Sequence, residues 1–562
     1  MHHHLSLRSK LIIMISVMAS LFLVALDQTI IATALGKIVA DFNSFDSLSW
    51  IVTAYLITTT ITVPIAGKLS DIFGRRKILL IGVAVFVIGS LLGGMSHNVT
   101  ELIMWRALQG IGGGIITANA FTIVGDLFAA RERGKWQGLI GAVFGLSSVI
   151  GPLLGGWLTE GQAILGLTTD WRWTFFINVP IGILAFVMIA IFSPTFKHAT
   201  KAVIDYAGAA LLAVALATLI LAVDNTETIF AGLIDATGVT LAWLRVIMFA
   251  IVTASVAGFI AVERRAVSPI ISLAFFKNRN FVLVVTVATL FGAAFMGSIL
   301  YLTQFNQQVF AASPTQSGLM LLPLVGGLMV TSIASGQIIS RTGRYKAFIQ
   351  VGFIMATVGM FLLTTLTPSI GYGYEAAIMV LLGLGMGVAL PVLNLAVQNE
   401  FEQKDLGAAT SSNQLFRSLG STIGTAVFGA MLTAGIVANI ASIQDTAYVK
   451  TLSASPQSSQ IGDLSEANTL LRINTPDVRT AIKEQANAQF DQLPAEVGAT
   501  LSSDFQTQES EFSHRVTQTF SDSLHRIFLV ATGVMVACTV LVFLLKERPL
   551  KSATPTQTPG DM

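Results

Sequence analysis

Two ionisable side chains stand inside long apolar stretches of this sequence: Asp27, which could carry a proton, and Arg106, which could pair with it. An ionised carboxylate inside a membrane costs about 3 kcal/mol or more unless it is paired or protonated. At about 1.5 Å per helical residue, Asp27 lies about 12 Å and Arg106 about 9 Å from the same membrane face. At such similar depths they can pair, and the guanidinium favours the ionised carboxyl whereas burial favours the neutral one. We interpret them as a proton carrier and its partner; the alternative is a permanent ion pair that only fixes helix packing.

The composition is that of a protein that crosses a membrane many times. Of its 562 residues, 53% are hydrophobic and only 11% are charged, and the mean hydropathy is +0.73. So much apolar surface excludes a soluble globule. The net charge of +2, with the basic residues in short clusters beside apolar runs, indicates no nucleic-acid partner.

The sequence gives no sign of metal, nucleotide or disulfide chemistry. Cys538 is the single cysteine, which excludes an intrachain disulfide. The histidines at positions 2–4 are interpreted as a solvated tail rather than a metal site. No glycine run has the Gly-x-x-x-x-Gly-Lys-Ser/Thr pattern of an ATP-binding loop. We therefore expect no enzyme, no metal and no cofactor.

Apolar stretches long enough to cross about 30 Å of hydrocarbon predict an all-α polytopic membrane protein with fourteen transmembrane helices. They cover roughly residues 11–36, 47–67, 78–96, 100–126, 135–158, 172–193, 205–223, 243–262, 281–308, 314–338, 347–367, 372–398, 408–438 and 523–545. The predicted division is an N-terminal tail (1–10), a six-helix bundle (11–194), two extra helices (195–265), a second six-helix bundle (280–545) and a disordered tail (546–562).

Lysine and arginine residues are distributed unevenly between the two sides. The short loops of one side hold only Lys37, Arg172 and Arg245, whereas the loops of the other side carry most of the remaining basic residues. Because cytoplasmic loops are enriched in lysine and arginine, this bias predicts a multi-pass protein of the cell membrane with both termini in the cytoplasm.

A compact charged turn, Gly67–Lys77, separates the second and third predicted helices. Its two glycines permit a tight turn, and Asp71 can cap the next helix or pair with Arg75 four residues on. The predicted conformational latch joins this turn to the charged end of the fourth helix and consists of Gly67, Asp71, Gly74, Arg75, Arg76, Asp126, Arg131 and Arg133. The alternative is a purely topological role, in which the basic residues only hold the loop inside.

The segment Gly336–Lys346 repeats the frame of this turn, with both glycines, one arginine and the final lysine in the same places. A second copy so far along the chain indicates two related halves. Ser340 stands where the first copy has Asp71. Any charge latch is therefore expected to be asymmetric.

Several motifs, taken in chain order, resemble those of the major facilitator superfamily. They are Leu26–Ile30, the turn Gly67–Lys77 with its copy, Arg106–Gly114, Gly151–Gly156 preceded by Gly145, and Trp171–Gly182. The first and last resemble signatures of the fourteen-helix drug:proton antiporter branch, whose members are multidrug efflux transporters. The resemblance implies a 6 + 2 + 6 helix arrangement of two parallel repeats. It also implies proton-driven export of lipophilic or cationic amphipathic compounds, a role in antibiotic resistance, and a coupling role for Asp27 and Arg106.

The fifth predicted helix is rich in small residues. Gly145, Gly151, Gly155 and Gly156 lie at spacings that allow close contact with a neighbouring helix, and Pro152 adds a kink. In the resemblance this run is the antiporter motif, which packs against the other half and marks exporters rather than symporters.

The predicted cavity between the halves has few acids, so we expect lipophilic, neutral or singly cationic substrates. Candidate contacts are aromatic or neutral polar residues and one buried arginine: Tyr55, Asn119, Phe295, Tyr301, Gln304, Phe305, Asn394, Gln398 and Arg417. Most could equally be helix packing residues, and Arg417 could equally be a structural anchor.

Residues 439–522 form the one sizeable extramembrane segment. Phe512, Val516, Phe520 and Leu524 recur every four residues and lead into the last helix, which predicts a partly helical outer cap. A mobile linker is the alternative for its first part.

The expected protein is a monomer whose partners are small substrates, protons and lipid. Two other functions stay open: export of one endogenous lipid, siderophore or metabolite, and a non-transporting membrane sensor.

Overall fold

The computed structural model describes residues 6–42, 48–159, 161–164, 166–193, 204–223, 226–310, 312, 314–454, 464, 467–474 and 476–550. In these residues, 14 helices are long and apolar enough to cross a membrane. This number confirms the predicted all-α class and the predicted count of spans. The histidines at positions 2–4 lie outside the described residues.

The N-terminal bundle follows the predicted spans closely. Its helices are α1 (Leu7–Phe42), α2 (Leu48–Phe73), α3 (Arg75–Gly94), α4 (Val99–Leu127), α5 (Ala130–Thr159), α6 (Trp173–Phe176) and α7 (Asn178–Phe192). The first helix continues to Phe42, past its predicted end at residue 36. A two-stranded antiparallel hairpin, β1 (Ala163–Ile164) with β2 (Leu167–Thr168), connects α5 to α6 and was not expected from the sequence.

The C-terminal bundle contains two spans that are broken. Its helices are α11 (Arg279–Val309), α12 (Pro314–Met320), α13 (Leu322–Thr342), α14 (Lys346–Leu363), α15 (Tyr372–Met386), α16 (Ala389–Glu400), α17 (Leu406–Val437) and α23 (Ala495–Phe543), with short 3₁₀ turns η2 (Leu273–Lys277) and η3 (Gln403–Asp405). The single helix predicted over 314–338 is interrupted at Leu321, just before Pro323. Proline lacks the N–H that a continuous helix needs, so the chain restarts there.

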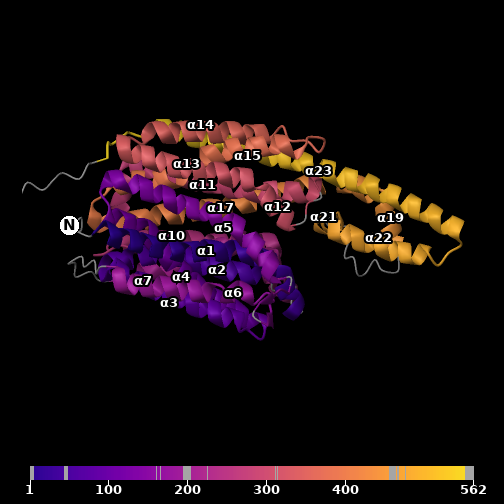
Figure 1. The fold of residues 1–562 in the computed structure, drawn as a ribbon, viewed down its shortest axis with the longest axis horizontal. Coiled ribbons are helices and arrows are strands. Elements are labelled where there is room, and N and C mark those ends of the chain that lie inside the picture. The colour runs from indigo at the N-terminus through magenta and orange to yellow at the C-terminus, as the bar shows by residue number, and fades with distance from the viewer. Residues whose placement is uncertain are drawn as a thin grey trace, which may run out of the picture.

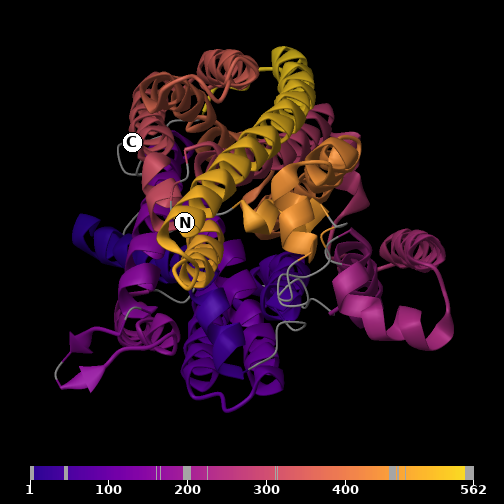
Figure 2. The same cartoon turned by 90° about the vertical axis from the view of Figure 1, so that its right-hand side faces the viewer.

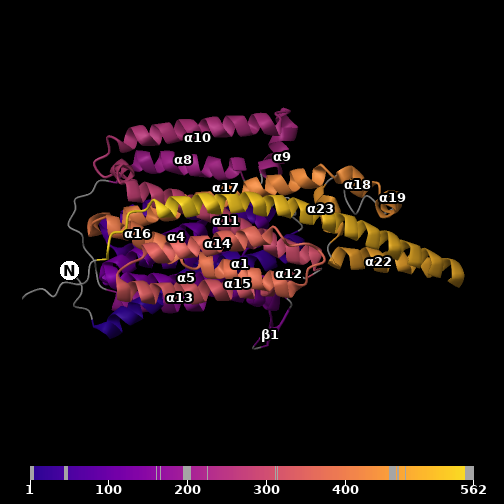
Figure 3. The same ribbon diagram turned by 90° about the horizontal axis from the view of Figure 1, so that it is seen from above.

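The two extra helices lie along one flank of the molecule. They are α8 (Tyr206–Val223) and α10 (Leu241–Glu263), joined by the short α9 (Thr226–Thr237). Figure 3 shows α8 and α10 side by side, and α8 contacts α2 and α17, one helix from each bundle. Seen end-on, this hairpin projects to one side of the bundles (Figure 2).

The cap, residues 439–522, projects from one end of the bundles (Figure 1). It consists of α18 (Ile440–Gln444), α19 (Ala447–Ala454), α21 (Ala467–Ile473), α22 (Pro476–Phe490) and the first part of α23, which continues without a break into the last span. The ring of Tyr448 packs between Phe505 and Phe512, with centroids 5.2 and 5.1 Å away. The cap therefore has a hydrophobic core of its own, mounted on a single long helix.

We call the end of the bundles that carries this cap the cap end, and the opposite end, with the turn Gly67–Lys77, the turn end. Both described ends of the chain lie at the turn end. The Lys10 ammonium lies 5.5 Å from the Phe128 ring, at the end of α4. The Leu550 amide donates to the Gly343 carbonyl at 3.0 Å, beyond the end of α13. Because the chain crosses between the two ends of the bundles an even number of times, its first and last spans must begin and finish at the same end.

The segment Lys546–Leu550 corrects the prediction that the tail is disordered from residue 546. It runs along the turn end as an ordered strap, where the Asn399 side chain donates to the Arg548 carbonyl at 2.8 Å. Leu550 is 3% exposed and belongs to the core of the C-terminal bundle. Burial beside this strap raises the pKa of Tyr345 to about 12. Burial of one leucine thus orders a segment whose composition alone indicated disorder; residues 551–562 lie outside the described residues.

Candidate functional site

The structure brings Asp27 of α1 and Arg106 of α4 into direct contact. The Arg106 Nη1 atom lies 2.5 Å from Asp27 Oδ2, and both side chains are 1% exposed. The other carboxyl oxygen accepts hydrogen bonds from Gln109 at 2.8 Å and from Asn178 at 3.3 Å. The carboxylate is thus paired and hydrogen-bonded, as a buried charge requires.

A second layer of polar contacts fixes this pair. Ser90 of α3 accepts hydrogen bonds from Gln109 and from Asn178, both at 2.9 Å. The Tyr55 ring of α2 lies 4.3 Å from the Arg106 guanidinium, a cation–π contact. Five helices of one bundle, α1 to α4 and α7, therefore meet at a single carboxylate.

Sequence reasoning did not assign Gln109, Asn178 or Ser90 to the site. A signal for Gln109 was present, because it follows Arg106 by three residues and so lies on the same face of α4. Asn178 and Ser90 sit on other helices, and no sequence spacing connects them with Asp27.

A mainly apolar cavity of about 320 Å³ lies between the two bundles, next to this network. Arg106 and Tyr55 line it from the N-terminal half, whereas Asp27 lies behind them. The remaining lining residues come from α1, α2, α5, α11, α13 and α16 and include Gln28, Thr29, Phe144, Gly145, Phe295, Met296, Leu324 and Leu390. A compound in this cavity would touch the partner of the carboxylate before the carboxylate itself.

Most of the other predicted substrate contacts do not line this cavity. Asn119 donates to the Ile115 carbonyl of its own helix, and Asn394 accepts from Asn413 at 2.9 Å. These contacts fit the alternative in which both amides serve helix packing. Tyr301, Gln304, Phe305 and Gln398 are likewise absent from its lining.

Arg417 is partly buried and also lies outside this cavity. Its Nε and Nη2 atoms donate to Gln414 Oε1 at 3.2 and 2.9 Å. Among the ion pairs of the described residues none involves Arg417. The contact with an amide of its own helix fits the anchor alternative.

The turn Gly67–Lys77 contains a buried ionic cluster. Arg75 is 0% exposed and forms ion pairs with Asp71, four residues earlier, and with Asp126 at the end of α4, at 2.8 Å. Gly74 has a φ of 93°, a conformation that a residue with a Cβ resists. Asp71 in turn accepts from the Ala408 amide at 3.0 Å. Because Ala408 begins α17, this contact joins the two bundles at the turn end.

The second copy of the turn also crosses to the opposite bundle, but without a carboxylate. A Cβ on Gly336 would collide with the backbone of Gly134 at the start of α5. Gly343 has a φ of 71°, and the Arg131 guanidinium lies directly against it. Each bundle therefore presents the first glycine of its turn to a helix of the other, whereas only the first copy adds a charge contact.

Three arginines of the predicted latch contact the protein backbone. Arg133 donates to the carbonyls of Gly125 and Phe128 at 2.8 and 3.1 Å, and Arg76 donates to the Ala190 carbonyl. Arg131 lies on Gly343, as described above. Among the described residues, the ion-pair partner of Asp126 is Arg75.

The glycines of α5 pack in two directions. A Cβ on Gly145 would approach Met329 of α13 at 2.9 Å, so this part of the helix faces the other bundle. Cβ atoms on Gly151 and Gly155 would instead collide with Thr29 and Thr33 of α1. The antiporter-like run thus packs α5 against the helix that carries Asp27.

We predict that Gly151→Val strongly destabilises the protein, because the new side chain would overlap the Thr29 hydroxyl in a tightly packed contact. Overpacking of this kind costs about 1–3 kcal/mol or more. Thermal unfolding of the purified protein measures the loss. Gly533→Val is the matched control, since no atom lies within 4 Å of a Cβ at that position in α23. Equal melting temperatures for the two variants would contradict the packing argument.

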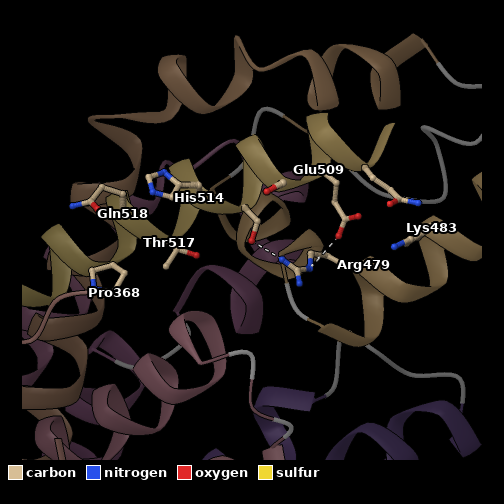
Figure 4. A pocket seen from close by; sticks show the side chains of 10 residues that line it. Pro368, Arg479, Lys483, Glu509, His514, Thr517 and Gln518 are labelled. Atoms are coloured by element: carbon tan, nitrogen blue, oxygen red, sulfur yellow. Dashed lines mark hydrogen bonds and ion pairs between the residues drawn. The ribbon is translucent and has the colours of Figure 1, made fainter. Parts of the chain in front are cut away.

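A separate, polar hollow of about 460 Å³ lies in the cap between α22 and α23, beside Pro368 (Figure 4). Within it, Arg479 pairs with Glu509 at 3.4 Å and donates to Ser513 at 2.5 Å. His514 and Lys483 also line this hollow. It shares no residue with the cavity beside Arg106.

Two helical bundles that face each other across an apolar cavity, with a buried ion pair beside it, define a membrane transporter. Among known proteins, the profile of the Major Facilitator Superfamily matches residues 17–425. The chain belongs to this superfamily of transporters and is therefore not an enzyme, as the motifs predicted.

Relatives and a solved structure agree with this assignment. The chain is 34% identical over 537 residues to multidrug transporter protein MdtP of Bacillus subtilis (strain 168), covering 95% of this chain and 92% of that one. It is 36% identical over 425 residues to multidrug resistance protein 3 of the same organism, with coverages of 75% and 79%. The superfamily proton:xylose symporter XylE, bound to 6-bromo-6-deoxy-D-glucose, shares the fold at 16% identity with a TM-score of 0.54, covering 75% of this chain and 88% of that one.

Proposed function

We propose that this transporter exports lipophilic or cationic amphipathic compounds in exchange for protons. The observation that carries the proposal is the Asp27–Arg106 pair, sealed at 1% exposure directly behind the wall of an apolar cavity. A compound that displaces Arg106 changes the surroundings of Asp27 and so the balance between its charged and neutral forms. The names of the two Bacillus subtilis relatives support multidrug export as the function.

The exchange of a compound for protons requires a transporter that opens to only one side of the membrane at a time. The contact between Asp71 and Ala408 holds the bundles together at the turn end, while the cavity lies toward the cap end of α2, where Val52, Tyr55 and Leu56 line it. Proton binding at Asp27 and opening of the turn end are then coupled by movement of whole bundles. Helix α4 connects the two sites, because it carries both Arg106 and Asp126.

The proton gradient of a cell membrane is sufficient to drive this exchange without another cofactor. One proton that crosses about 100 mV contributes about 2.3 kcal/mol, and one pH unit adds about 1.4 kcal/mol. The sum sustains a gradient of about a few hundredfold for a neutral compound. The bias of basic residues toward the turn end supports a cytoplasmic location for that end and an outer location for the cap.

The proposal is tested with inside-out membrane vesicles in which an imposed pH gradient, acidic inside, drives uptake. We expect lipophilic cations and neutral dyes to accumulate and a protonophore to abolish the accumulation. Transport of only one endogenous lipid or metabolite from a broad panel would favour the specific-exporter alternative. Uptake of none of the panel, with or without a gradient, would contradict export altogether.

A further inference from the structure

A second fully buried carboxylate lies outside the Asp27 network. Glu375 of α15 and Asn306 of α11 are both 0% exposed, and the Asn306 amide lies 2.9 Å from both carboxyl oxygens of Glu375. No ion pair of the described residues involves Glu375. The Tyr372 hydroxyl, from the same helix, is a titratable group close to Glu375. Sequence reasoning overlooked this carboxylate because it stands in the first turn of its helix, close to a polar loop.

The neighbouring membrane-spanning helices α11, α13, α14 and α16 carry no charge near Glu375. The charged residues of α11, α13, α14 and α16 all lie at the turn end, and they are Arg279, Arg341, Lys346 and Glu400. Glu375 lies at the cap end, at the start of α15. A carboxylate with neither water nor a cation beside it is costly to keep ionised inside a membrane protein.

The partner of Glu375 suits both of its protonation states. With its nitrogen toward Glu375, the Asn306 amide donates to an ionised carboxylate. With its oxygen toward Glu375, the same amide accepts from the neutral acid at the same position. A lysine or arginine partner would stabilise only the ionised state. This pair can therefore gain or lose a proton without losing its hydrogen bond.

The pair lies on the two helices of the C-terminal bundle that correspond to those of Asp27 and Arg106 in the N-terminal one, but nearer to the cap end. The helices α1 and α4 are the first and fourth spans of their bundle, and α11 and α15 are the first and fourth spans of theirs. In the N-terminal bundle the carboxylate is on the first span, whereas in the C-terminal bundle it is on the fourth. Its partner there is an amide instead of a guanidinium.

We propose that Glu375 is a second proton-binding group of this transporter. This inference deepens the proton-coupled function proposed above and rests on it.

The position of Glu375 links its protonation to the cap end of the C-terminal bundle. The main-chain carbonyl of Asn306 accepts a hydrogen bond from the main-chain amide of Ala312 at 3.2 Å, where the chain turns from α11 into α12. The Tyr372 hydroxyl donates to the Met320 carbonyl at 2.9 Å, which ties the first turn of α15 to the end of α12. Gln308, two residues after Asn306, binds Asn474 of the cap at 3.0 Å. A change of charge at Glu375 therefore acts on the junction of α11, α12, α15 and the cap.

Infrared difference spectroscopy of the purified full-length protein, titrated from about pH 5 to about pH 10, tests the proposal directly. We expect a band of a neutral carboxyl group that fades as the pH rises and that is lost in Glu375→Gln. The matched control Glu484→Gln, which removes an exposed carboxylate of the cap helix α22, should keep the band. Asn306→Leu should shift the frequency of the band, because the carboxyl loses its hydrogen-bond partner.

An unchanged spectrum in Glu375→Gln would overturn the proposal. If that variant does not fold, an unchanged band in Asn306→Leu overturns it instead. The failure of this inference is distinct from failure of the proposed function. Gradient-driven uptake with no band from Glu375 removes Glu375 alone, whereas a titrating Glu375 band without any gradient-driven uptake supports proton binding and removes the transport cycle.

Discussion

Asp27→Asn is expected to abolish proton-driven accumulation while leaving the fold intact. Asparagine keeps the shape of the side chain, and its one oxygen can still accept from Arg106. Its amide nitrogen cannot accept from Gln109 as the second carboxyl oxygen does, and the side chain cannot exchange a proton. In inside-out vesicles the accumulation ratio of a neutral substrate should fall from at most about a few hundredfold to about one. Exchange of labelled for unlabelled substrate, which needs no proton, should persist and is measured on the same vesicles.

Asp41→Asn is the matched control because it makes the same substitution on the same helix. Asp41 is about half exposed and pairs with Arg172 at 3.2 Å at the cap end of α1. Such a surface pair contributes about 0–1 kcal/mol, so accumulation should stay close to that of the parent protein. Undiminished gradient-driven uptake in a well-folded Asp27→Asn variant would remove Asp27 from the mechanism.

The spans could be predicted because each depends on a property of consecutive residues. Long apolar stretches must form helices in a membrane, where backbone groups can only bond within the segment. The breaks inside two spans were missed since Pro323 and Pro391 interrupt stretches whose hydropathy does not change. The ordered strap that ends at Leu550 was missed for the opposite reason, because its order comes from a contact with another part of the chain.

In the candidate site, too, some contacts could be predicted from the sequence and others could not. The contact between Asp27 and Arg106 could be predicted from depth, as two buried charges at similar height in one bundle must find partners. The direction of each neighbouring side chain could not be predicted. Gln109 reaches Asp27, whereas Arg133 donates to the backbone carbonyls of Gly125 and Phe128. Rotation of each helix about its axis decides these contacts, and hydropathy alone does not determine that rotation.

The cluster at the turn end gives the second large expected effect, from Arg75→Ala. Arg75 is the shared ion-pair partner of Asp71 and Asp126, whose side chains are 8% and 0% exposed. Removal of one partner from a buried ion pair costs about 3–5 kcal/mol, because a buried charge is left unpaired. Asp71 also holds the start of α17, so the closed turn end should lose a comparable amount relative to the open one. That shift corresponds to about a hundredfold or more in their ratio.

Distances between spin labels measure this opening. With Cys538 replaced by serine, labels at Glu132 and Lys404 report on the separation of the two bundles, because these exposed residues begin α5 and η3 at the turn end. We expect a longer distance to become the main population in Arg75→Ala. Lys77→Ala removes the same charge from the same turn, but Lys77 is exposed and should leave the distances unchanged. Parent-like distances in Arg75→Ala would mean that glycine packing alone, at Gly67 and Gly336, closes the turn end.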